Sequence, residues 1–200
     1  MKAEDQLSRI LSACALFSGQ TSDYDLSPDV VLSPNRELKS AGVLVPILNT
    51  KAGHVVFMTR RSLTLKQHPG QIAFPGGKKD AGDSDVIVTA LREANEEIGI
   101  ARSNVEVVGQ LPKHETVTGF VITPVIGRIM EEFTPVAEAG EVEEVFSVPL
   151  SHVLNPLNYS IRSRLWRGRP RPYYTVPYGP YYIWGATARI LHMMSEIANK

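Results

Sequence analysis

Residues 74–100 read FPGGKKDAGDSDVIVTALREANEEIGI, a tight glycine turn followed by a short polar loop and an amphipathic segment. Apolar residues in the last part recur near every fourth position, at Val86, Ala90, Ala94 and Ile98. This period predicts an α-helix with Asp83 or Ser84 as its amino-terminal cap. Gly99 is expected to end the helix, because glycine adopts the left-handed conformation that closes many helices without steric cost.

Short apolar runs on both sides of this helix predict strands. They cover 41–48, 54–59 and 71–74 before it, and 105–111, 121–130 and 142–148 after it. Pro124 weakens the prediction for part of 121–130, since proline cannot donate a backbone hydrogen bond. Residues 156–182 are expected to form a long ordered loop with a short strand, and Trp184–Ile197 a second amphipathic helix. This order predicts an α/β fold, an α/β/α sandwich with a mixed sheet and one central glutamate-bearing helix.

The length and charge balance suit one compact domain. The chain has 200 residues, and its 21 basic and 21 acidic side chains give a formal net charge of zero. We therefore expect neither a nucleic-acid partner nor attraction to an anionic membrane. We expect residues 36–200 to form the domain, with residues 1–35 as an amino-terminal helix and arm packed on it.

The chain carries the features of a cytoplasmic protein. Cys14 is its only cysteine, so neither an intrachain disulfide nor a thiolate metal cluster is expected. Glu4 and Asp5 stand where an export signal would be positively charged. The apolar positions from Leu7 to Phe17 instead follow helical spacing, and no apolar run approaches the roughly 18 residues that span a bilayer.

Three carboxylates gather on one part of the central helix. Residues three and four apart share a helix face, so Glu93 lies beside both Glu96 and Glu97, while Arg92 can reach Glu96. Hard oxygen ligands of this kind suit Mg²⁺ or Mn²⁺. A solvated acidic face is the ordinary alternative. The preceding glycine turn favours a site, because Gly77 lets the backbone approach a metal or a phosphate closely.

Gly77 to Ile100 resembles the Nudix box, G-x5-E-x7-R-E-U-x-E-E-x-G-U, in which U is a bulky aliphatic residue. Arg92 to Ile100 match the second half, with Ala94 at the first U. The first half departs: Asp83 stands in place of the box glutamate, and eight residues rather than seven separate it from Arg92.

The resemblance implies both the sandwich fold and a reaction, the hydrolysis of a nucleoside diphosphate linked to another group. It also implies that Glu93 and Glu97, with Glu96, bind divalent metal ions, and that Arg92 orients a glutamate. Gly76 or Gly77 would offer a backbone carbonyl to a metal. A homodimer is a further expectation that only the family supplies.

Residues 57–77, FMTRRSLTLKQHPGQIAFPGG, resemble the signature that precedes the box in the coenzyme A pyrophosphatase branch. The resemblance implies that the substrate-binding residues include Arg60, Arg61, Lys66, His68, Gly70 and Gln71. The 3′-phosphate of coenzyme A demands cations beyond those that hold a diphosphate, and this segment supplies them in a neutral protein. The implied products are 4′-phosphopantetheine and adenosine 3′,5′-bisphosphate. Ordinary loop charges are the alternative interpretation.

Two later segments carry candidate residues. Four glutamates lie in the sequence AEAGEVEEVFSVPL, and of these Glu141 and Glu144 are the leading candidates for a general base or an added metal ligand. Solvent-facing glutamates are the alternative. Arginines at 162, 164, 167, 169 and 171 are compatible with a nucleic-acid surface, a phosphate gate, a dimer loop or an exposed loop. His114 is interpreted as a surface histidine.

The leading hypothesis is a metal-dependent hydrolase of coenzyme A or an acyl derivative. A second keeps the chemistry and changes the substrate to ADP-ribose or a dinucleotide. A third is a sensor with this fold that binds without turnover; degenerate carboxylates would favour it, yet Glu93, Glu96 and Glu97 are all present.

Overall fold

The computed structural model describes residues 19–33, 35–166 and 168–199. The helix predicted between Leu7 and Phe17 lies outside these residues. The described strands are β1 (Thr21–Ser22), β2 (Lys39–Thr50), β3 (Gly53–Arg61), β4 (Ile72–Ala73), β5 (Gly76–Lys78), β6 (Val105–Gln110), β7 (His114–Glu115), β8 (Phe120–Ile129), β9 (Val142–Pro149), β10 (Ser160–Trp166) and β11 (Arg169–Thr175). The helices are α2 (Val86–Ile98), α3 (Leu150–Val153) and α4 (Ala186–Ala198), with short 3₁₀ turns at Arg102–Asn104 and Pro156–Asn158.

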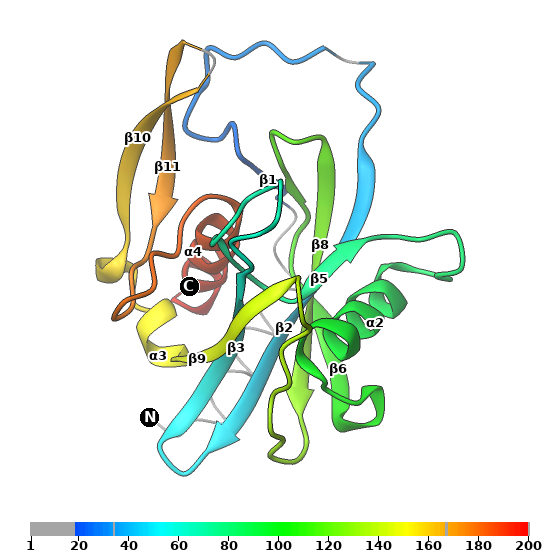
Figure 1. The fold of residues 1–200 in the computed structure, drawn as a ribbon. Coiled ribbons are helices and arrows are strands. Elements are labelled where there is room, and N and C mark those ends of the chain that lie inside the picture. The colour runs from blue at the N-terminus through cyan, green and yellow to red at the C-terminus, as the bar shows by residue number, and fades with distance from the viewer. Residues whose placement is uncertain (1–18, 34, 167, 200) are drawn as a thin grey trace.

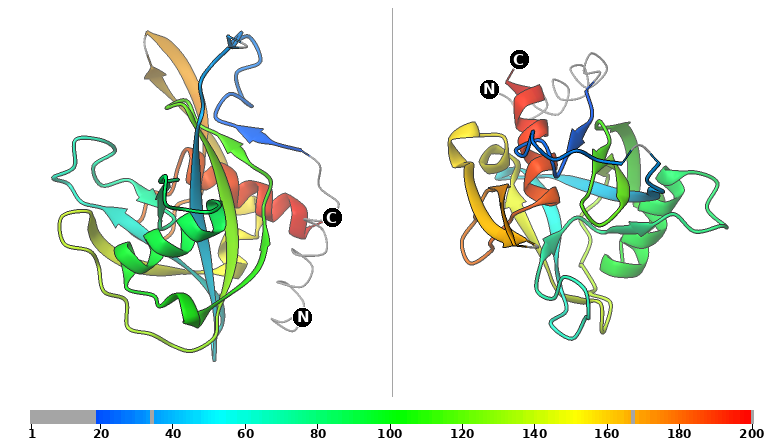
Figure 2. Two further views of the ribbon diagram at one scale, coloured as in Figure 1. Left: turned by 90° about the vertical axis from the view of Figure 1, so that its right-hand side faces the viewer. Right: turned by 90° about the horizontal axis from the view of Figure 1, so that it is seen from above.

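The long strand β2 lies inside a mixed sheet and is buried from both sides. It pairs in parallel with β8 and antiparallel with β3 and β5, while β6 and β7 extend the sheet beyond β8 and β9 pairs with β3. Val43, Val45 and Ile47 face the core that α4 covers, whereas Leu44 and Leu48 face the core under α2. Figure 2 shows these two helices on opposite sides of the strands. The predicted α/β/α sandwich is confirmed.

Helix α2 packs unusually close to β2. A Cβ atom on Gly42 would lie 2.2 Å from the carbonyl oxygen of Val86, the first residue of the helix. The end of the helix is as predicted, since Gly99 adopts φ 72° and its N–H bonds to the carbonyl of Asn95. The start was predicted one or two residues too early, because Asp85 is the cap. Its Oδ1 accepts hydrogen bonds from the N–H groups of Ile87 and Val88, both at 2.9 Å.

Two further predictions need correction. Pro124 lies within β8, and its carbonyl accepts a hydrogen bond from the Leu111 N–H at 2.9 Å. The nitrogen of a strand residue points to the same side as its carbonyl. The missing N–H of Pro124 therefore faces the break between β6 and β7, where no strand needs it. Residues 156–182 hold an antiparallel hairpin, β10–β11, rather than a long loop with one short strand. The hairpin projects beside α4 (Figure 1). The short strand predicted at 71–74 is confirmed as β4, which pairs with β3, and the carbonyl of Gln71 accepts a further hydrogen bond from the Arg61 N–H at 3.0 Å.

His114 is fully buried rather than on the surface, because the amino-terminal arm covers it. The arm residues of β1 pair in parallel with β7, and the hydroxyl of Thr21 is hydrogen-bonded to Nδ1 of His114 at 2.9 Å. Within the described residues, no helix has the length and apolar character needed to cross a membrane.

Candidate active site

The three carboxylates of α2 sit at three different depths. The side chain of Glu96 is half exposed at 50%, that of Glu93 is 19% exposed, and the residue Glu97 is 4% exposed. Glu97 is buried because it falls on the same face as Ala90 and Ala94, which pack against the sheet. A carboxylate therefore occupies a position where the helix pattern would place an apolar residue, and burying a carboxylate is costly without a partner.

Glu97 points at the glycine turn. Its Oε2 accepts a hydrogen bond from the Gly76 N–H at 3.1 Å. Burial raises the pKa of Glu97 to about 8, although the Gly76 hydrogen bond and the charge of Arg61 act in the opposite direction. Such a group is ready to exchange its proton for a cation.

Glu93 lies against the next residue of the turn. A Cβ atom on Gly77 would lie 2.5 Å from the carboxyl carbon of Glu93 and 2.6 Å from each of its oxygens, so only glycine leaves room for this carboxylate. Burial raises the pKa of Glu93 as well, partly offset by the charge of Arg92. The turn and the helix thus enclose two desolvated carboxylates.

Arg92 holds this arrangement from the outer side. Its Nη1 lies 2.9 Å from Glu93 Oε1 and 3.0 Å from Glu96 Oε2. On its other side the guanidinium binds both oxygens of Asp83, whose side chain is only 5% exposed. The hydrogen bond from Arg92 holds the pKa of Asp83 well below its usual range, and Asp83 raises the pKa of Arg92.

Although the loop is one residue longer than in the Nudix box, Asp83 still provides Arg92 with an acidic partner. Asp83 also accepts hydrogen bonds from the Thr89 hydroxyl at 2.9 Å and the Asp80 N–H at 3.0 Å, which pin its carboxylate beneath the helix.

The donor set fits Mg²⁺ or Mn²⁺. Within the described residues no three His, Cys, Asp or Glu side chains converge into a complete cage. The paired oxygen donors of Glu93 and Glu97 suit a hard cation that keeps several of its own waters. Gly77 has no side chain, so its backbone lies directly beside the Glu93 carboxylate.

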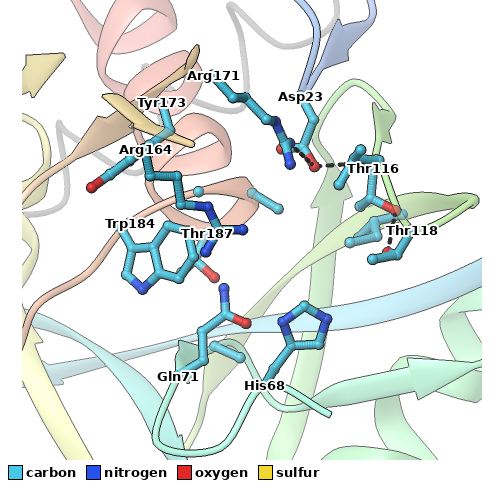
Figure 3. A pocket seen from close by; sticks show the side chains of 15 residues that line it. Asp23, His68, Gln71, Thr116, Thr118, Arg164, Arg171, Tyr173, Trp184 and Thr187 are labelled. Atoms are coloured by element: carbon cyan, nitrogen blue, oxygen red, sulfur yellow. Dashed lines mark hydrogen bonds and ion pairs between the residues drawn. The ribbon is translucent and has the colours of Figure 1, made fainter. Parts of the chain in front are cut away.

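A cavity begins at this turn. Its volume is about 300 Å³, and its lining includes Arg61, Gln67, His68, Gly76 and Gly77. A second cavity of about 190 Å³ shares several of its walls, including His68, Thr116, Thr118 and Thr187. Figure 3 shows the second cavity, with His68 and Gln71 on one side and the arginines of the β10–β11 hairpin on the other.

The substrate-binding residues predicted within 57–77 differ in whether they line a cavity. Arg61 and His68 line the first cavity and Gln71 the second. Gly70, at φ 68°, forms the turn that leads into β4. Arg60 instead pairs with Glu144 at 3.2 Å, and the exposed Lys66 lines neither cavity.

The two candidate bases differ in their surroundings. Besides Arg60, Glu144 binds the Tyr181 hydroxyl, which donates to its Oε1 at 2.6 Å. Glu141 is exposed and close enough to Glu97 for its charge to raise the pKa of Glu97.

Two residues that line the second cavity, Asp23 and Trp184, were not predicted from the sequence, whereas Arg171 belongs to the arginine-rich stretch already noted. Arg171 forms an ion pair with Asp23 at 2.9 Å, which joins the hairpin to the amino-terminal arm. The alternation of arginine with other residues from 162 to 171 matches the period of a strand, and this pattern was the available signal for the β10–β11 hairpin.

The comparison with known families agrees with the fold and the carboxylate-bearing helix. The family model described as NUDIX domain matches residues 38–166, which include β2, the glycine turn and α2. The chain therefore belongs to the Nudix family and is a Nudix pyrophosphohydrolase.

Related Nudix hydrolases are similar to this chain beyond the residues that the family model matches. The chain is 40% identical over 184 residues to a protein of Escherichia coli O139:H28 described as "Uncharacterized Nudix hydrolase NudL", covering 90% of this chain and 95% of that protein. It is 38% identical over 169 residues to the protein of the same description from Photorhabdus laumondii, covering 84% and 89%. The MutT/nudix family protein from Enterococcus faecalis shares the fold at a TM-score of 0.53 and 14% identity, over 88% of this chain and 68% of that one.

Proposed function

We propose that this enzyme hydrolyses the diphosphate of coenzyme A, or of an acyl derivative, with Mg²⁺ or Mn²⁺ as its cofactor. The observation that carries the proposal is the position of Arg61 and His68. Both belong to the segment that resembles the coenzyme A pyrophosphatase signature, and both line the cavity that opens at Gly76 and Gly77. A polyanionic substrate in this cavity would meet the positive charge of Arg61 and the imidazole of His68, close to the glycine turn that contacts the carboxylates of α2.

Each side chain has a distinct task in this proposal. Glu93 and Glu97 would hold the cation, with Glu96 as a further oxygen donor and Arg92 fixing the positions of Glu93 and Glu96. When bound, the cation neutralises the diphosphate and lowers the pKa of a water. Arg61 adds positive charge from the cavity wall, and Gly77 leaves room for the Glu93 carboxylate.

The reaction consumes one water. Its oxygen forms a bond to one phosphorus, the bridging P–O bond breaks, and the bridging oxygen leaves with the electron pair. A carboxylate must accept the water proton. Glu141 is the better candidate, because it is exposed and near Glu97, whereas Glu144 is engaged with Arg60 and Tyr181.

Turnover with three substrates tests the proposal. The purified enzyme would be incubated with Mg²⁺ or Mn²⁺ and, separately, coenzyme A, ADP-ribose and a dinucleotide polyphosphate, with products separated by chromatography. We expect coenzyme A to be hydrolysed faster than the other two substrates, with release of adenosine 3′,5′-bisphosphate. This release should be lost in Glu97→Gln. Preferential cleavage of another diphosphate would overturn the substrate. No turnover of any of them would favour a sensor that binds without catalysis.

A further inference from the structure

The β10–β11 hairpin brings an arginine into the second cavity. Arg164 lines it, and Figure 3 shows its guanidinium pointing inward, next to Trp184 and toward Gln71 and His68. Within the described residues, no Asp or Glu lies at ion-pair distance from Arg164. The guanidinium instead lies over two aromatic rings: its carbon is 4.4 Å from the ring centroid of Trp184 and 5.5 Å from that of Trp166.

The neighbouring charges in the cavity compensate one another. Arg171 stands opposite Arg164 in the hairpin register and is paired with Asp23 at 2.9 Å. Asp23 also accepts the Val117 N–H at 2.9 Å and lies 3.4 Å from Nε2 of His114, so its carboxylate is fully occupied. This leaves the charge of Arg164 available to a ligand, on a side chain already oriented by the rings. Little rotamer freedom is then lost when an anion binds.

The position of Arg164 relative to the catalytic turn fits a nucleotide. His68 lines both cavities, and desolvation together with the charges of Arg61 and Arg164 lowers its pKa, so both arginines act on this one side chain. Arg61 stands at the end near Gly77 and Arg164 at the hairpin end. One molecule with a diphosphate and a separate phosphate could engage both. The amino terminus of α4 lies in the same wall, at Gly185, Ala186 and Thr187, and no side chain caps it, so its positive dipole end faces the cavity.

We propose that Arg164 binds the phosphomonoester of the nucleotide substrate, which for coenzyme A is the 3′-phosphate, and so determines the preference for substrates that carry this group. The inference rests on the proposed function for the identity of the nucleotide. The extra phosphate is thereby assigned to Arg164, on a hairpin far along the sequence. Arg60 and Lys66, which the sequence suggested for this task, line neither cavity.

A comparison of coenzyme A with 3′-dephospho-coenzyme A measures this preference. For Arg164→Gln we expect kcat/KM for coenzyme A to fall about 10- to 100-fold, the usual cost of removing a charge-assisted hydrogen-bond donor. The value for 3′-dephospho-coenzyme A should stay within about twofold. Arg164→Lys should recover part of the loss, because it keeps the charge without the planar fork. A fall of equal size for both substrates, or for neither, would overturn the proposal.

Arg169→Gln is the matched control. Arg169 lies on the same hairpin, is exposed, and does not line this cavity, so the substrate preference should be unchanged. Thermal unfolding of each variant, followed by circular dichroism, reports whether the hairpin substitution disturbs the fold.

Binding without turnover separates this inference from the proposed function. Calorimetry would compare adenosine 3′,5′-bisphosphate with adenosine 5′-monophosphate on the wild type and on Arg164→Gln. If coenzyme A is not hydrolysed, tighter binding of the bisphosphate that disappears in Arg164→Gln still supports the phosphate site while the substrate proposal fails. Equal affinity for the two nucleotides on the wild type would refute the site, whatever the enzyme hydrolyses.

Discussion

Both carboxylate oxygens of Asp83 accept hydrogen bonds from the guanidinium of Arg92, from Nε at 3.1 Å and from Nη2 at 3.0 Å. The same guanidinium contacts Glu93 and Glu96 on its other side. Asp83 therefore acts on the site through Arg92, at a loop position where the Nudix box has a glutamate and a shorter spacing.

We expect Asp83→Asn to lower kcat about 10- to 100-fold, as is typical when a residue supporting metal ligands is changed. The amide cannot accept both hydrogen bonds, so Arg92 no longer holds Glu93 and Glu96 in place. Initial rates with saturating Mg²⁺ measure the effect. Asp85→Asn makes the same chemical change two residues away, where asparagine caps a helix equally well, and should stay within about twofold. Equal rates for Asp83→Asn and the wild type would mean that Arg92 is held without Asp83.

Gly77→Ala should reduce kcat about 100-fold while leaving the fold intact. The new methyl group would stand 2.5 Å from the Glu93 carboxyl carbon, so this mobile side chain must swing away from the site. Calorimetric titration with Mn²⁺ should show weaker binding alongside the loss of rate. The control is Gly82→Ala, because a Cβ there has no atom within 4 Å. Full activity in Gly77→Ala would remove Glu93 from the proposed metal site.

The pKa of Glu97 predicts a pH-dependent stability in the absence of metal. Burial raises this pKa from its ordinary 4.5 to about 8, so the folded state favours the protonated carboxyl. The protonated Glu97 side chain then contributes its full share of the free energy of unfolding below pH 4.5. This contribution, measured against Glu97→Gln, is lost as the pH rises through about 8. Melting temperatures of both proteins in chelator, measured from pH 4.5 to 9, give this difference. Parallel curves would contradict the assignment.

Gly42→Ala should destabilise the whole domain by about 1–3 kcal/mol or more, the usual cost of overpacking a core. A Cβ there would meet the backbone oxygen of Val86 at 2.2 Å, and a backbone atom at the start of α2 cannot rotate away. Urea unfolding followed by fluorescence measures the change in free energy. An unfolding midpoint equal to that of Gly82→Ala would show that α2 can shift from β2 without cost.

Local patterns in the sequence predicted most of the elements around the site. The spacing of apolar residues from Val86 to Ile98 was sufficient for α2, and Gly99 ended it as expected. The predictions failed where a distant segment decides the outcome. Pro124 is accepted in β8 because neighbouring strands leave a gap beside it, and His114 is buried because the arm residue Thr21 packs over it.

The sequence by itself determined the Nudix family and the relative positions of Glu93, Glu96 and Glu97, because spacing along one helix is a local property of the chain. Only the tertiary structure decided that Glu97 is buried under the Gly76 N–H, that Asp83 reaches Arg92, and that Arg60 pairs with Glu144 outside both cavities. It also placed Arg164 in a cavity with His68, almost a hundred residues earlier. Depth and charge environment depend on which segments pack together, and residue spacing alone does not contain that information.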